Sequence, residues 1–160
     1  MTPLFLRRLP AFTVLFIWTS ASAQPLGDEL FVGGAGEFET IGEAMAEAVD
    51  GDVVTVRAGT YEETVETRAP GVTLRAEAGA NVLVTQAHYV LRVRHERFTA
   101  EGIIFDGQYS ERDVVQVRGE SHQLTLRRVE VRRGGGDCVD MGSQHDVTIE
   151  DSLIHHCLKT

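Results

Sequence analysis

A repeat of 24 residues limits the folds open to this chain more than any other feature of its sequence. The segments 90–93, 114–117 and 138–141 read VLRV, VVQV and CVDM, and they begin 24 residues apart, twice in succession. A second apolar run recurs within each unit, as FTAEGIIF, LTLRRVEV and VTIEDSLI. A constant period in the twenties, with two or three strands in each unit, indicates a solenoid of stacked coils.

Two other fold classes fit the repeat less well. Leucine-rich repeats share its period, but the sequence lacks their regular Leu/Asn pattern and a helix in each unit. A β-sandwich requires hairpin turns between its strands, and only Asp50-Gly51 and Asp106-Gly107 have that character. The sequence therefore predicts an all-β protein, a right-handed parallel β-helix.

The alternation of side chains along each strand predicts which of them fill the interior. We expect the inward positions to be Leu91/Val93, Val115/Val117 and Val139/Met141 in the first strand, Phe98/Ala100, Leu124/Leu126 and Val147/Ile149 in the second, and Ile103/Phe105, Val129/Val131 and Ile154 in the third. Arg92, Gln116 and Asp140 then form one outward column, about 4.8 Å apart per coil. A second outward column places Arg127 between two glutamates.

One short amphipathic helix precedes the strands. Segment 40–50, TIGEAMAEAVD, begins with Thr40 as N-cap and has Glu43 three residues later, which is a capping box. Its apolar residues share one face at helical spacing, so we expect it to cap the first coil. The chain then divides into a leader (1–23), a lead with the capping helix (24–52) and the coils (53–160). We expect the coils to be truncated at the C-terminus, because no cap follows them.

The first 23 residues have the order of a secretory signal peptide. Arg7 and Arg8 precede an apolar stretch that is short for a membrane span, and the small residues Ala21-Ser22-Ala23 follow it. Cleavage removes two of the 15 basic residues and none of the 24 acidic ones, which leaves a formal charge of −11. Nucleic acid is not an expected partner of so acidic a chain. We expect a secreted, periplasmic or cell-surface monomer without a membrane span after cleavage.

Segment 38–65, FETIGEAMAEAVDGDVVTVRAGTYEETV, resembles the opening of pectate-lyase-like β-helix proteins. Those proteins often begin with the pattern TI..A...A..GD.V.V..G.Y.E, which this chain matches from Thr40 to Glu63. The next coils are similar to those of alginate-, chondroitin- and pectate-type lyases, and the resemblance covers about residues 31–160. It implies this fold and an acidic polysaccharide as substrate or ligand. The superfamily also includes hydrolases, epimerases and non-catalytic surface proteins, so its chemistry stays open.

The resemblance to lyases implies a base that removes the proton beside a uronate carboxylate, and a cation, commonly Ca²⁺, that neutralises that carboxylate. Asp137 and Asp140 are the candidate calcium ligands, because two carboxylates three residues apart across a turn can share one ion. A solvated turn is the alternative for both. For substrate binding we single out Arg92, Gln116 and Asp140 from the first column, and Arg127 from the second. The base is not identified, and the candidates by residue type are Arg127, Arg128, Arg132, Arg133 and Lys159.

Histidines, cysteines and glycines supply three further expectations. His122 and His145 each lie two residues before the second strand of their unit, so we expect them to stack at one turn, with a two-histidine metal site as the alternative. Export permits a disulfide between Cys138 and Cys157, but we expect buried free thiols, because the repeat places one on a strand and the other near a turn. The run 134–136, Gly-Gly-Gly, is interpreted as a flexible turn.

Three functions remain open at this point. The first is a polysaccharide lyase that acts on an acidic polysaccharide by β-elimination. The second is a non-catalytic β-helix that binds glycans or serves as a surface structure. The third is a glycoside hydrolase or an epimerase on the same fold, and a hydrolase would need paired carboxylates beside its substrate.

Overall fold

The computed structural model describes residues 27–159, which form a right-handed parallel β-solenoid of about five turns. All strand pairs are parallel, and three sheets run along the solenoid axis. Sheet A contains β1 (Glu29–Val32), β2 (Val53–Val56), β5 (Thr73–Ala76), β8 (Thr99–Glu101), β11 (Thr125–Arg127) and β14 (Thr148–Glu150). Sheet B contains β3 (Gly59–Glu62), β6 (Val82–Thr85), β9 (Ile103–Asp106), β12 (Glu130–Arg132) and β15 (Leu153–His155). Sheet C contains β4 (Val65–Glu66), β7 (Leu91–Val93), β10 (Val115–Val117) and β13 (Val139–Met141).

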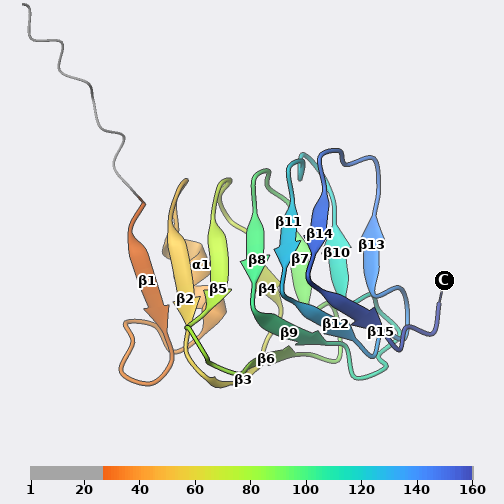
Figure 1. Ribbon diagram of the computed structural model, residues 1–160, viewed down its shortest axis with the longest axis horizontal. Helices are drawn as coiled ribbons and strands as arrows, with labels where there is room; N and C mark the ends of the chain where they lie inside the picture. Colours follow the sequence, from red (N-terminus) through yellow and green to blue (C-terminus); the bar gives the residue numbers. More distant parts are fainter. Residues whose placement is uncertain (1–26, 160) are drawn as a thin grey trace, which may run out of the picture.

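Each coil passes through sheets A, B and C in that order, and the coils follow one another along the long axis of the molecule (Figure 1). The predicted register is confirmed, because Val115 pairs with Leu91 on one side and with Val139 on the other. Both sheet C intervals are therefore 24 residues. In sheet A the interval varies, from 20 residues between Val53 and Thr73 to 26 between Thr73 and Thr99. The turns absorb this variation, since the strands stay in register.

The core is the shared interior of the coils, as the alternation predicts. Every inward position of the two central coils is buried, and Phe98, Phe105 and Leu126 are among the largest fully buried side chains. Burying one such side chain contributes about 1.5–3 kcal/mol. The inward positions of the last rung are less covered, since Met141, Ile149 and Ile154 are each 40% exposed. The register is right there, but no further rung of the described chain covers these residues.

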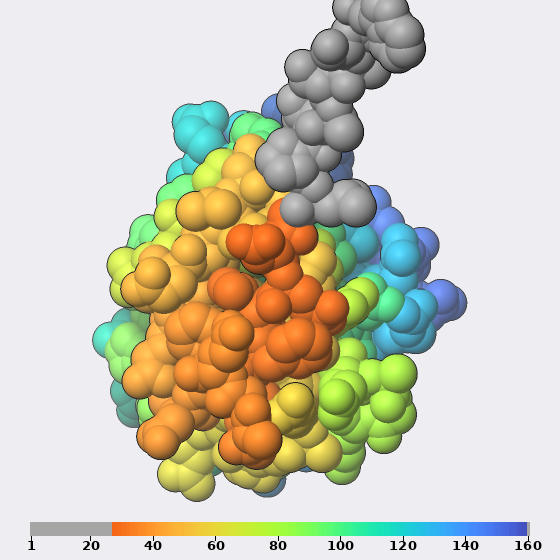
Figure 2. All heavy atoms as spheres, turned by 90° about the vertical axis from the view of Figure 1, so that its left-hand side faces the viewer, coloured from red at the N-terminus to blue at the C-terminus, as the bar shows by residue number. Residues whose placement is uncertain are grey.

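Helix α1 (Ile41–Glu47) covers the first end of the stack, where it packs against β1, β2 and β4. Figure 2 looks onto this end and shows residues near the beginning of the described chain spread across it. The predicted capping box is confirmed: Thr40 and Glu43 satisfy each other's backbone N–H groups. The stack itself begins earlier than residue 53, because β1 precedes the helix and pairs with β2.

The opening motif has a structural role at this cap. The carboxylate of Glu63 accepts hydrogen bonds from the backbone N–H groups of Ile41 (2.9 Å) and Gly42 (2.7 Å), which are free donors at a helix start. The buried carboxylate of Asp52 accepts from the N–H groups of Asp28 and Val49, both at 2.8 Å. These residues hold the helix and the first strand onto the stack. The motif therefore bears on the fold and leaves the chemistry to other residues.

Cys138 and Cys157 form a disulfide, so the expectation of free thiols was wrong. Their Cα atoms are 5.4 Å apart, within the usual range for a disulfide. Cys138 directly precedes β13, and Cys157 follows β15, where the chain returns to the same B-to-C turn one coil later. The bond therefore closes the last coil onto the one before it. The repeat alignment separated the two residues because it ignored the shorter turns of this coil.

The predicted signal peptide lies outside the described residues and stays a prediction. Within residues 27–159, no helix has both the length and the apolar character needed to cross a bilayer.

Candidate functional site

The outer surface of sheet C carries most of the predicted binding residues. Arg92, Gln116 and Asp140 are direct neighbours on β7, β10 and β13, so the predicted column is present. Glu66 on β4 extends it by one coil. Arg127 is not part of this surface, because it projects from β11 in sheet A, where its Nε donates to Glu150 at 2.5 Å. The structure thus brings three of the four residues together.

A second column on the same surface consists of arginines that the sequence reasoning missed. Continuing the register two residues beyond Glu66 and Arg92 aligns Arg68, Arg94 and Arg118 in three successive coils. Their distance from the strand centres hid them, although the same period in the sequence would have revealed them. We call the outward side chains of both columns the arginine face, which consists of Glu66, Arg68, Arg92, Arg94, Gln116, Arg118 and Asp140.

Ion pairs hold the arginine face in place. Glu66 lies 2.6 Å from Arg94, 3.6 Å from Arg68 and 4.0 Å from Arg92. Asp140 pairs with Arg118, and this hydrogen bond raises the pKa of the Arg118 guanidinium. Four guanidinium groups therefore face two carboxylates, and this local surplus of positive charge stands out on an acidic protein. Such a surface attracts polyanions, provided that they approach this side.

An aromatic side chain borders the arginine face at the turn between sheets B and C. The guanidinium carbons of Arg92 and Arg112 lie 5.3 and 5.9 Å from the ring centre of Tyr89. Both distances fit cation–π contacts, which are worth about 0.5–1 kcal/mol at exposed sites. The Nε atom of Arg92 is buried and has no hydrogen-bond partner within residues 27–159. Tyr89 therefore keeps Arg92 close to the sheet and extended toward its turn.

The candidate calcium ligands have partners within the protein. The carboxylate of Asp140 is engaged by Arg118, and the backbone N–H of Asp137 donates to Asp113 Oδ1 at 3.0 Å. Across residues 27–159, no group of three or more His, Cys, Asp or Glu side chains is arranged to hold a metal ion. Calcium binding by Asp137 and Asp140 stays a prediction.

The predicted stacking of His122 and His145 is confirmed. Their ring centres are 3.8 Å apart and their planes differ by 10°. His145 Nδ1 lies 2.8 Å from the carboxylate of Asp146, and His122 Nε2 lies 3.5 Å from that of Glu120. The pair belongs to the turn between sheets C and A, away from the turn that carries Tyr89.

The three-glycine run has a packing role, which differs from the predicted flexible turn. A Cβ atom at Gly135 would lie 1.9 Å from the carbonyl oxygen of Ser110, and one at Gly136 would lie 2.6 Å from Asp113 Oδ1. Successive B-to-C turns are in backbone contact here. Glycine is required because no side chain fits between them.

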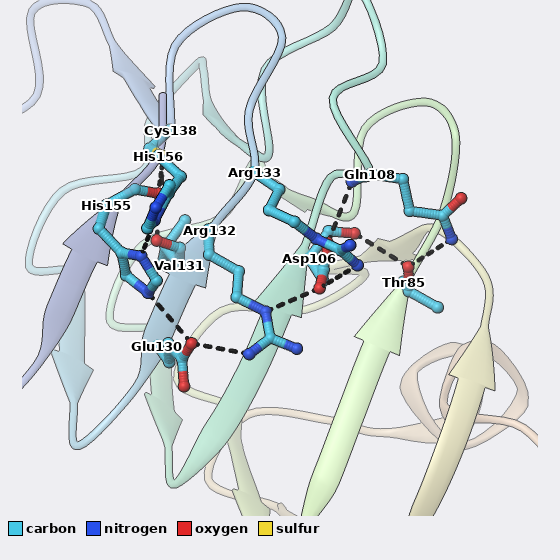
Figure 3. A network of polar contacts seen from close by, with 10 residues as sticks. All are labelled: Thr85, Asp106, Gln108, Glu130, Val131, Arg132, Arg133, Cys138, His155 and His156. Atoms are coloured by element: carbon cyan, nitrogen blue, oxygen red, sulfur yellow. Dashed lines mark hydrogen bonds and ion pairs between the residues drawn. The ribbon is translucent and has the colours of Figure 1, made fainter. Parts of the chain in front are cut away.

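A pocket of about 260 Å³ lies where the strands of sheet B end, and the sequence reasoning did not find it. Its lining residues are Tyr109, Arg132, Arg133, His155 and His156. Figure 3 shows the network behind it, in which Arg132 and Arg133 converge on Asp106. Asp106, Arg132 and His155 occupy one outward position of β9, β12 and β15. The 24-residue alignment was applied to only the first strand of each unit for outward residues, so this column was overlooked.

Asp106 is completely buried and holds the two arginines by three hydrogen bonds. Arg132 Nε donates at 2.7 Å, Arg133 Nε at 2.7 Å and Arg133 Nη2 at 2.6 Å. Burial alone would raise the pKa of Asp106, but the hydrogen bonds from Arg133 and Arg132 outweigh it and the pKa lies below its ordinary value. The pKa of Glu130 is lowered in the same way, since hydrogen bonds from Arg132 and His155 outweigh its burial.

The substitution Asp106→Asn should therefore destabilise the protein in a pH-dependent way. A carboxylate with a lowered pKa stabilises the fold above its unfolded pKa of about 3.9, and this contribution is lost as the pH falls through the folded pKa. We expect the variant to lose about 1–3 kcal/mol of unfolding free energy at neutral pH, and the gap to wild type to close below about pH 4. Urea unfolding at both pH values measures it. Asp151→Asn, at an exposed turn, is the matched control, and a gap of constant size would contradict the account.

No protein-family model matches this sequence, and no curated protein matches it either. The functional argument therefore rests on the fold and on the two surfaces described above.

Proposed function

We propose that this chain is an exported carbohydrate-active protein of the pectate-lyase-like β-helix superfamily, which acts on an acidic polysaccharide by β-elimination. The arginine face is the observation that carries the proposal. It repeats charged side chains coil after coil along the axis, and a linear polymer with a carboxylate on each sugar repeats its charge in the same way. A straight surface of this kind suits an extended chain better than a compact ligand.

The proposed chemistry needs charge stabilisation at the uronate. A base removes the proton beside the carboxylate, its electron pair forms a carbon–carbon double bond, and the neighbouring glycosidic C–O bond breaks. Negative charge develops on the carboxylate as the proton leaves, and nearby guanidinium groups lower that barrier. Arg92, Arg94 and Arg118 are the groups of this face that would bind and orient the uronates. A calcium ion held by Asp137 and Asp140 would neutralise the same charge.

Export is supported by the disulfide between Cys138 and Cys157, because disulfides persist mainly in oxidising compartments. A non-catalytic glycan-binding protein is the second candidate. One observation favours it: both carboxylates of the arginine face, Glu66 and Asp140, are already engaged in ion pairs and are poorly placed to accept a proton.

The experiment incubates the full-length protein with pectate, alginate and chondroitin, each with and without EDTA, and follows the absorbance of unsaturated uronate ends. The proposal predicts product from at least one polymer, and its suppression by EDTA would support the calcium ligands. If no polymer yields product, the lyase assignment is wrong. Retention of the same polymers in an affinity gel would then favour the non-catalytic candidate.

Variants locate the binding surface within the same experiment. We expect Arg94→Gln to weaken polymer binding about two- to fivefold, since an exposed charge contributes up to about 1 kcal/mol. Arg127→Gln, on sheet A, is the control and should bind as wild type does. Equal losses for the two variants would contradict the role of the arginine face.

A further inference from the structure

The pocket at the end of sheet B is a preformed anion site. Its two arginines are held by Asp106, whose side chain is fully buried. Asp106 is in turn fixed by its own surroundings: the backbone N–H of Gln108 donates to its Oδ1 at 3.1 Å, and the hydroxyl of Thr85 donates to its carbonyl oxygen at 3.0 Å. Without this carboxylate between them, the two guanidinium groups would repel each other. The site therefore exists before any ligand arrives.

Each arginine retains hydrogen-bond donors for a ligand. Arg132 uses Nε for Asp106 and Nη1 for Glu130 (2.8 Å), while Arg133 uses Nε and Nη2 for Asp106. Within residues 27–159, no hydrogen bond engages Arg132 Nη2 or Arg133 Nη1. Planar guanidinium groups match the two oxygens of a carboxylate, and such charge-assisted pairs are the stronger hydrogen bonds of proteins.

The histidines on the other wall form a chain of hydrogen bonds with a defined direction. His155 Nε2 lies 3.1 Å from Glu130 Oε1, and His155 Nδ1 contacts His156 Nδ1 (Figure 3). Because the glutamate only accepts, Nε2 of His155 donates to it, and Nδ1 of a neutral His155 must then accept from His156 Nδ1–H. This assignment leaves His156 Nε2 with a lone pair. The pocket thus offers an acceptor for a hydroxyl group opposite its two cationic donors.

The pocket suits one sugar ring. Its volume of about 260 Å³ is slightly below the range of about 300–1,000 Å³ for drug-sized ligands. Tyr109, 46% exposed, forms part of its wall and adds an apolar ring with a hydroxyl group. We propose that this pocket binds a single uronic acid unit, with its carboxylate on Arg132 and Arg133 and a ring hydroxyl on His156. The inference does not rest on the proposed activity, because a non-catalytic protein would bind in the same way.

Calorimetric titration of the full chain with monomeric galacturonate and glucuronate tests the site. At least one should bind, while galactose, which lacks the carboxylate, should not. Arg133→Gln should weaken uronate binding about tenfold or more, since hydrogen bonds between charged groups are worth about 1.5–3 kcal/mol. Arg133 is partly exposed, so this variant should keep its fold, which circular dichroism checks. Arg127→Gln is the matched control and should leave the affinity unchanged.

Two further titrations distinguish the pocket from the arginine face and from a site for any small anion. Arg94→Gln should weaken polymer binding and leave the monomer affinity intact, so failure of the polysaccharide assignment would not remove the pocket. Inorganic phosphate should bind more weakly than the uronate, because it cannot place a carboxylate and a ring hydroxyl together. The proposal is overturned if Arg133→Gln binds uronate as wild type does, if neither uronate binds, or if phosphate binds as tightly as the uronate.

Discussion

Replacing Phe105 with alanine should lower the free energy of unfolding by about 3–5 kcal/mol, the usual cost of removing a buried aromatic ring. Phe105 is fully buried in β9, with Val84 of β6 and Val131 of β12 as its neighbours in the inward column. The cavity would lie in the middle of the stack. A solenoid is stabilised by contacts between successive coils, so a central cavity weakens the coupling between its two halves.

Ile104→Ala is the control for this substitution. Ile104 is the next residue of β9, but its side chain points outward and is only half-buried. We expect it to cost about 1 kcal/mol, because partly exposed sites lose less on truncation. Urea unfolding followed by circular dichroism compares the two variants. An equal or larger loss for Ile104→Ala would mean that the faces of β9 are reversed.

Removing the disulfide should cost about 3 kcal/mol, which is the expected effect for a closed loop of roughly this length. Cys138 and Cys157 are 19 residues apart, and the loop between them contains β13, β14 and β15. The double substitution Cys138→Ser/Cys157→Ser therefore releases one whole coil, whose inward residues are already partly exposed. The loss should be concentrated there, since each coil contacts only its neighbours.

Hydrogen exchange locates the effect of this double substitution. Amides of β13, β14 and β15 should exchange faster than in wild type, while those of β5 and β8 should keep their protection. Treatment of the wild-type protein with a reducing agent should give the same pattern, and the double variant should not respond to it. A double variant as stable as wild type would contradict the pairing.

The fold could be predicted because few variables determine it. Strand residues alternate in direction, and a coil must place apolar residues toward a shared axis, so Leu91, Val115 and Val139 had to align. The period also predicted the column of Arg92 and Gln116, which depends on the backbone alone. These features follow from the register and are insensitive to the details of the turns.

The pocket and the disulfide could not be predicted in this way, because both depend on turn length. Between sheets B and C the chain takes a different path in each coil, and this path decides whether Arg133 reaches Asp106 or whether Cys157 reaches Cys138. A hydrogen bond from Arg133 spans 27 residues and not the 24 of the repeat. Alignment by one period finds contacts within the strands and misses contacts across the turns.

The crystal structure of the protein with a bound oligouronate tests the central claim most directly. The account predicts an extended oligomer along β7, β10 and β13, with its carboxylates facing Arg92, Arg94 and Arg118. An oligomer lying across the outer surface of sheet A, or no bound oligomer at concentrations that saturate polymer binding in solution, would contradict it.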